Sequence, residues 1–159
     1  DCSDHHCPGR LAATLSGAAL AQDTAHDHGA AAPHKLALDA GRKWATDEPL
    51  RAGMQRIRAL VAPQLQAAHI GKLTPAQYRQ LATQVETEVG GIVANCKLEP
   101  KADAMLHLVI ADMAQGVDAM AGKNARMRPA LGLVKVAQAV DQYGGYFDHP
   151  GFEPIRHVR

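Results

Sequence analysis

The chain has 159 residues, which is enough for one domain with a hydrophobic core. Hydrophobic residues make up 47% of the sequence, aromatic residues only 4%, and alanine supplies much of the apolar content, as is typical of a helical protein. The net charge of +1 argues against a nucleic-acid-binding surface, and no apolar run reaches the roughly 18 residues needed to span a bilayer.

The beginning of the chain has the pattern of an export signal. Residues 11–21 form a short apolar segment that ends in Ala19-Leu20-Ala21, a small-x-small cleavage pattern, and polar sequence follows at once. We interpret residues 1–21 as a signal peptide or an appended segment, with a buried or amphipathic helix as the alternative. A signal peptide predicts a periplasmic protein whose mature chain keeps one cysteine, Cys96.

Residues 22–45 have the composition of a flexible linker. They contain Gly29 and Pro33 and show no apolar period. This segment also holds three closely spaced histidines: His26, His28 and His34. Imidazoles on a flexible chain can chelate copper, nickel or zinc, so we identify them as candidate metal ligands; a solvated tail without a ligand is the alternative.

The first helix is expected to begin at Thr46 or Asp47 and to end at Gly71. Asp47 is a favourable N-cap, and Glu48-Pro49 suits the first helical turn. An apolar stripe follows at helical spacing: Leu50, Met54, Ile57, Val61, Leu65 and Ala68. Pro63 lies inside this stripe and predicts a kink, because proline removes one backbone hydrogen bond.

The second helix has the clearest start, because residues 74–77 read Thr-Pro-Ala-Gln, a capping box with proline at the first helical position. Its apolar stripe runs from Tyr78 to Cys96. Gly90-Gly91 is expected to weaken the helix locally and to allow close packing by a neighbour.

Two further helices are expected, one from Glu99-Pro100 to Gly122 and one from Arg128-Pro129 to about Phe147. Four amphipathic helices joined by short connections predict an all-α fold, an antiparallel up-down-up-down four-helix bundle over residues 46–149. Residues 150–159 are expected to form a C-terminal tail.

This topology brings several chemically active side chains to one end of the bundle: Met54, Cys96, His107, Tyr143, Tyr146 and His149. The same end collects five of the six aromatic residues: Trp44, Tyr143, Tyr146, Phe147 and Phe152. Only Tyr78 falls at the other end. Core packing alone would spread such bulk along the bundle axis, so the concentration indicates a site.

The candidate metal ligands at this end are Met54, Cys96, His107 and His149, with Asp103, Trp44, Tyr143 and Tyr146 as supporting residues. Thioether, thiolate and imidazole groups suit copper. Asp103 lies one helical turn before His107 and can orient its ring. Each ligand has a structural alternative: Met54 and Cys96 can fill core space, His107 can bond to Asp103 or cap a helix end, and His149 can be a turn residue.

Met54, within residues 50–54 (Leu-Arg-Ala-Gly-Met), also supports a resemblance. The predicted bundle resembles the periplasmic four-helix b-type cytochromes and the cytochromes c-prime. The b-type resemblance implies haem held by a methionine of the first helix and a histidine late in the fourth. Here the nearest histidines are His149, just past the fourth helix, and His107, and the absence of Cys-x-x-Cys-His excludes covalent c-type haem. Residues 95–107 are similar to a segment of uncharacterised exported proteobacterial proteins.

Three functions therefore stay open. The first is a periplasmic copper-binding protein for homeostasis or delivery. The second is a non-covalent haem b protein for electron transfer or sensing. The third is a cofactor-free interaction module that docks through its aromatic end, in which Cys96 could link a homodimer. An enzyme is not expected, because the sequence has no nucleophile elbow, phosphate loop or zincin pair.

Overall fold

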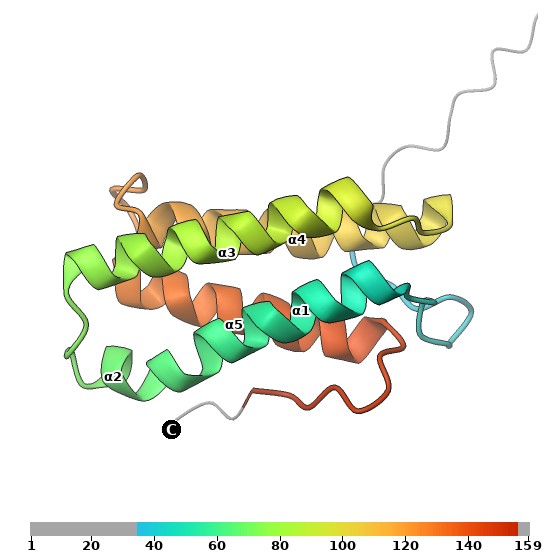
Figure 1. Cartoon of the computed structure of the whole chain (residues 1–159), viewed down its shortest axis with the longest axis horizontal. Helices are drawn as coiled ribbons and strands as arrows, with labels where there is room; N and C mark the ends of the chain where they lie inside the picture. Colours follow the sequence, from blue (N-terminus) through green and yellow to red (C-terminus); the bar gives the residue numbers. More distant parts are fainter. Residues whose placement is uncertain (1–34, 156–159) are drawn as a thin grey trace, which may run out of the picture. The chain divides into compact units, whose positions relative to one another are not determined.

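A computed structural model describes residues 35–155, and in this range the protein is all-α, with no strand. The helices run in the order α1 (Glu48–Val61), the 3-10 turn η1 (Ala62–Gln64), α2 (Leu65–His69), α3 (Pro75–Asn95), α4 (Pro100–Met120) and α5 (Pro129–Tyr146). They form the expected antiparallel up-down-up-down bundle, in which α1, η1 and α2 together make the first arm (Figure 1). No helix in residues 35–155 is both long and apolar enough to cross a membrane.

The predicted helix starts are confirmed. Asp47 is the N-cap of α1, and its Oδ1 accepts a hydrogen bond from the Leu50 backbone N–H at 3.1 Å. Thr74 and Gln77 form the reciprocal capping box of α3. Both α4 and α5 have a proline in the first turn, where its missing N–H costs no intrahelical hydrogen bond.

The helix against which the first arm packs changes at Pro63. Before this residue, α1 packs mainly on α3; after it, α2 packs on α5. Pro63 has no backbone N–H to donate, and the chain passes through the single 3-10 turn η1 at this point. The predicted kink is therefore present, and it moves the end of the arm away from α3.

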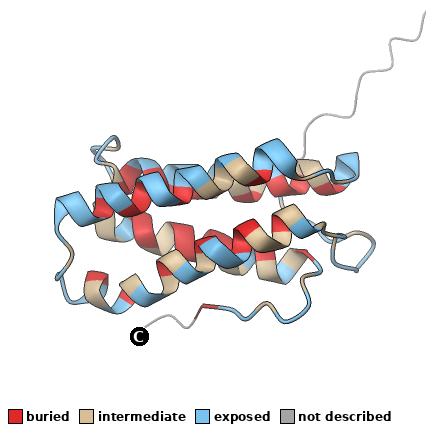
Figure 2. Ribbon diagram, in the orientation of Figure 1, coloured by how far each residue is buried: buried red, intermediate tan, exposed pale blue. Residues whose placement is uncertain are grey.

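The inner faces of the four arms form one apolar core (Figure 2). The predicted stripe of the first arm is buried along its whole length, and no polar or charged residue in the described range is buried. The largest fully buried side chains include Tyr143, Phe147, Met54 and Ile92. Since burial of apolar surface is the main favourable term in folding, this core holds the bundle together.

The backbones of α4 and α5 approach each other closely at Gly116 and Gly132. A Cβ atom added to Gly132 would lie 2.5 Å from the carbonyl oxygen of Gly116, and the reverse distance is also 2.5 Å. The two backbones therefore meet almost directly. The expectation of close packing at Gly90-Gly91 is wrong, because a Cβ atom there would meet nothing within 4 Å.

Both flanking segments pack on the bundle as far as the structure describes them. Trp44 donates its backbone N–H to the Tyr146 carbonyl at 2.9 Å and accepts from the Asp148 N–H at 2.8 Å. In the C-terminal segment, Ile155 is buried, and its N–H donates to an Asp141 carboxylate oxygen at 2.7 Å. Residues 35–45 and 150–155 are therefore part of the folded domain.

We expect Gly132→Ala to lower the free energy of unfolding by about 1–3 kcal/mol, because the new methyl group would collide with backbone that cannot yield locally. Gly90→Ala is the matched control. It lies in α3 with open space around it, and the gain in helix propensity should stabilise the protein by up to about 1 kcal/mol. Urea unfolding of both variants measures the difference. Equal effects would contradict the close helix contact.

Candidate functional site

The aromatic end predicted from the sequence exists, but its centre is tightly packed. Tyr143 is fully buried, and its ring stacks on Phe147 with centroids 5.3 Å apart and meets the edge of Phe152 at 5.1 Å. Its hydroxyl shares a 2.9 Å hydrogen bond with Nδ1 of His149. Burial raises the pKa of Tyr143 far above its ordinary value, so this phenol stays protonated.

His149 is held from two sides in the turn after α5. Its ring lies 4.8 Å from the Phe152 ring, and its Nδ1 is engaged by Tyr143. The pKa of His149 is lowered, first by burial and then by the positive charge of Arg51, while Glu48 opposes the shift. The neutral imidazole is therefore favoured, in a structural role that locks the turn onto the bundle.

Met54 and Cys96 both pack against the apolar core, to different depths. Met54 is fully buried in the core, so its thioether offers no open coordination position. Cys96 is the C-cap of α3 and packs half-buried against the core. Burial raises the pKa of its thiol, and the negative charges of Asp47 and Asp103 raise it further, so the thiolate is disfavoured.

His107 lies on the exposed surface of α4, where Asp103 orients it as expected. Its Nδ1–H donates to the Asp103 carbonyl at 2.9 Å, and the Asp103 carboxylate lies 3.3 Å away. With the proton of the neutral ring on Nδ1, the lone pair on Nε2 can bind a metal ion. Of the other supporting residues, Trp44 donates its indole N–H to the Ala37 carbonyl at 2.7 Å, and Tyr146 packs on the core.

The part of the chain between residues 35 and 155 contains no group of three or more His, Cys, Asp or Glu side chains that could hold a metal ion. Of the predicted ligands in this range, Met54 is fully buried, Cys96 is half-buried, His149 packs against Phe152, and His107 is exposed. His26, His28 and His34 lie outside the described residues, as does the predicted signal peptide.

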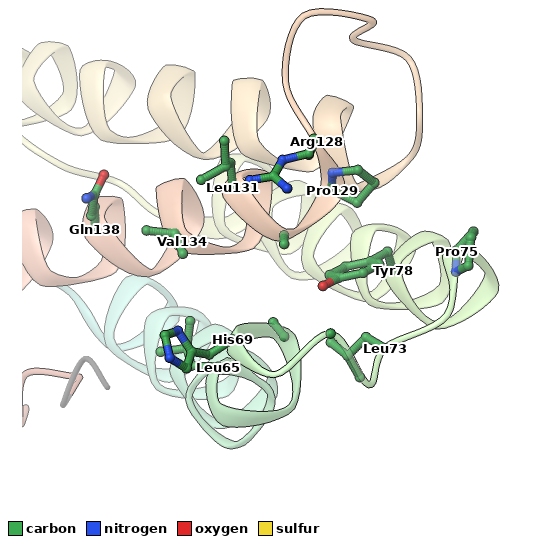
Figure 3. A pocket seen from close by; sticks show the side chains of 13 residues that line it. Leu65, His69, Leu73, Pro75, Tyr78, Arg128, Pro129, Leu131, Val134 and Gln138 are labelled. Atoms are coloured by element: carbon green, nitrogen blue, oxygen red, sulfur yellow. The ribbon is translucent and has the colours of Figure 1, made fainter. Parts of the chain in front are cut away.

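A hollow lies at the opposite end of the bundle, between α2, the start of α3 and the first half of α5 (Figure 3). It is an open groove with a volume of about 740 Å³. Thirteen residues line it: Leu65, Ala68, His69, Gly71, Leu73, Pro75, Tyr78, Arg128, Pro129, Ala130, Leu131, Val134 and Gln138. We call this hollow the α2–α5 groove.

The floor of the α2–α5 groove consists of buried core side chains, whereas its wall includes a side chain that is exposed to solvent. Leu65, Ala68 and Tyr78 are less than one-tenth exposed, whereas Leu131 is 50% exposed. Figure 3 shows the Tyr78 side chain reaching from α3 into the space between α2 and α5, with His69 on the α2 side and Arg128 on the α5 side. Burial raises the pKa of Tyr78, so its hydroxyl is a hydrogen-bond donor at any physiological pH.

Sequence reasoning missed this groove. It treated Tyr78 as one member of an apolar stripe and Arg128-Pro129 only as a helix start. Two signals could have indicated it: Pro63, which predicts that the first arm bends, and the single aromatic residue at an otherwise aliphatic end. Neither predicts by itself that α2 leaves α3 and packs on α5.

Comparison with known proteins does not place the chain in a family. No family model matches it, and no curated protein or solved structure shows detectable similarity. The function therefore has to be argued from the described residues.

The lowered pKa of His149 predicts how the stability of the protein depends on pH. Because the pKa of His149 is lower in the folded protein than in the unfolded chain, the unfolded chain binds this proton first as the pH falls below about 7. His149 should therefore cost stability from about pH 6.5 downward. His149→Asn cannot take up this proton and keeps an acceptor for Tyr143.

The stability advantage of the natural protein over His149→Asn should shrink between pH 7.5 and pH 5, as measured by urea unfolding at each pH. An advantage that stays constant or grows over this range would show that His149 is not held as the neutral imidazole.

Proposed function

We propose that this protein is a small-ligand-binding helical bundle, and that the α2–α5 groove takes up an elongated apolar molecule. The observation that carries the proposal is the groove itself, which reaches down to the buried side chains of Leu65 and Ala68. Its volume of about 740 Å³ lies within the range of roughly 300–1,000 Å³ that is usual for small-molecule sites.

The chemistry of the lining supports an apolar ligand. Most lining residues are aliphatic, alanine or proline, and a few polar groups sit among them, which is the usual composition of a ligand pocket. A ligand that covers Leu131 and the groove floor removes apolar surface from water at about 25 cal/mol per Å², so binding gains free energy without any charged contact.

The test uses N-phenyl-1-naphthylamine, an uncharged probe whose fluorescence rises in apolar surroundings. Two equally exposed apolar residues provide a variant and its control: Leu131 lines the groove and is 50% exposed, while Val93 on α3 is 54% exposed and lies away from it. Leu131→Gln should weaken probe binding by about fivefold or more, because roughly 1 kcal/mol of apolar burial is lost.

Val93→Gln should leave the affinity unchanged. The proposal fails if the natural protein does not bind the probe, or if both substitutions reduce binding equally.

Copper binding is a second candidate, and the observation that favours it is the orientation of His107. Asp103 holds the Nδ1–H of the ring, so the lone pair of Nε2 is available to a metal ion. This is the usual arrangement of a metal-bound histidine. In this proposal Nε2 would act with the Cys96 thiol and with His26, His28 and His34 of the preceding segment. Nothing in the surroundings of Met54 favours the haem alternative, since that side chain is fully buried.

The copper proposal predicts that the Cys96→Ala/His107→Ala double variant of the full chain loses at least about tenfold in Cu(I) affinity without unfolding. Competition with a chromophoric chelator measures the affinity, and the circular dichroism melting curve checks the fold. His69→Ala is the control, because it removes an exposed histidine from another part of the bundle. Unchanged affinity in the double variant would exclude Cys96 and His107 as ligands.

A further inference from the structure

We propose that the ligand of the α2–α5 groove is a single-chain amphiphile with a carboxylate head, and that Tyr78, Arg128 and the N-terminus of α5 bind this head. The inference rests on the proposed function and specifies the ligand of the same groove. Three independent features of the described residues support it.

The first feature is an unpartnered hydroxyl. Tyr78 is only 6% exposed, yet its hydroxyl has no hydrogen-bond partner among residues 35–155. The hydroxyl oxygen is not sealed from solvent either, because the described range contains no fully buried side-chain oxygen or nitrogen without a partner. Figure 3 shows the hydroxyl end of Tyr78 directed into the groove. The hydroxyl therefore opens into the groove without a protein partner, where it can donate a hydrogen bond to an acceptor on a ligand.

The second feature is the uncapped start of α5. Arg128 occupies the N-cap position, and no side chain there accepts a hydrogen bond from the first turn. The first backbone N–H of the helix with an acceptor is that of Gly132, so the N–H groups of Ala130 and Leu131 have none in the described range. Both residues line the groove. The free N–H groups and the helix dipole make this end of an 18-residue helix attractive to an anion.

The third feature is charge. Arg128 has no ion pair with any described residue, and the groove lining contains Arg128 and His69 but no aspartate or glutamate. A carboxylate can accept hydrogen bonds from a guanidinium, a phenol and backbone N–H groups at once, because it has two oxygens with about four acceptor positions. The polar rim therefore complements a small anion, while the floor complements an alkyl chain.

The shape of the groove favours a free amphiphile over a membrane surface. The apolar floor at Leu65 and Ala68 is recessed below the half-exposed Leu131, so a single chain can enter but a flat bilayer surface cannot reach it. The charged groups at the rim would then hold the head of a ligand whose tail lies inside.

The experiment compares three decyl compounds in displacing N-phenyl-1-naphthylamine from the full chain at pH 7.5. We expect decanoate to bind at least about tenfold more tightly than decanol, and decyltrimethylammonium to bind most weakly. Tyr78→Phe and Arg128→Gln should each lower the ratio of the decanoate affinity to the decanol affinity about fivefold or more, because decanol shares the tail but lacks the carboxylate. Tyr146→Phe, a substitution at the opposite end, should leave this ratio unchanged.

The outcomes separate this inference from the proposed function. Equal affinities for the three heads, with the probe still bound, would overturn the carboxylate inference and leave the apolar groove intact. Absence of probe binding would overturn both. Binding to anionic phosphatidylglycerol vesicles without binding of decanoate would assign the groove to a membrane surface and overturn the inference about a free amphiphile.

Discussion

The break at Pro63 determines where the first arm packs and where the groove forms. A straight first arm would follow α3 to the end of the bundle and bury its apolar stripe there. Because proline cannot donate to the preceding turn, the arm bends through η1, and α2 packs on α5 instead. The loop at residues 70–74 then returns the chain to α3, and the space left between α2, α3 and α5 is the groove.

Hydrogen bonds connect the elements at the other end of the bundle. Asp47 caps α1 through one carboxylate oxygen, and its second oxygen accepts the Lys97 N–H at 2.6 Å, which ties the turn between α3 and α4 to the start of α1. Trp44 adds backbone hydrogen bonds to both sides of Phe147. The aromatic residues at this end are therefore packed together, whereas the groove at the other end reaches the buried side chains of Leu65 and Ala68.

Much of the fold could be predicted from local sequence signals. Asp47, the Thr74–Gln77 capping box and the prolines of the first turns fix where helices begin, and the apolar stripes fix which faces are buried. The site could not be predicted in the same way. Residues that share one end of a bundle need not face one another: Met54 points into the core while His107 lies on the surface. The close contact of Gly116 with Gly132 also depends on a tertiary register that local signals do not carry.

The proposed ligand site lies at the end of the molecule that has few aromatic residues and contains the α2–α5 groove. The most direct test of this claim is to record amide NMR spectra of the full chain during a decanoate titration. Shifts should concentrate on α2, the first turn of α3 and the N–H groups of Ala130 and Leu131. Shifts that concentrate instead around Trp44, Cys96 and His149, or no shifts at all, would contradict the central claim.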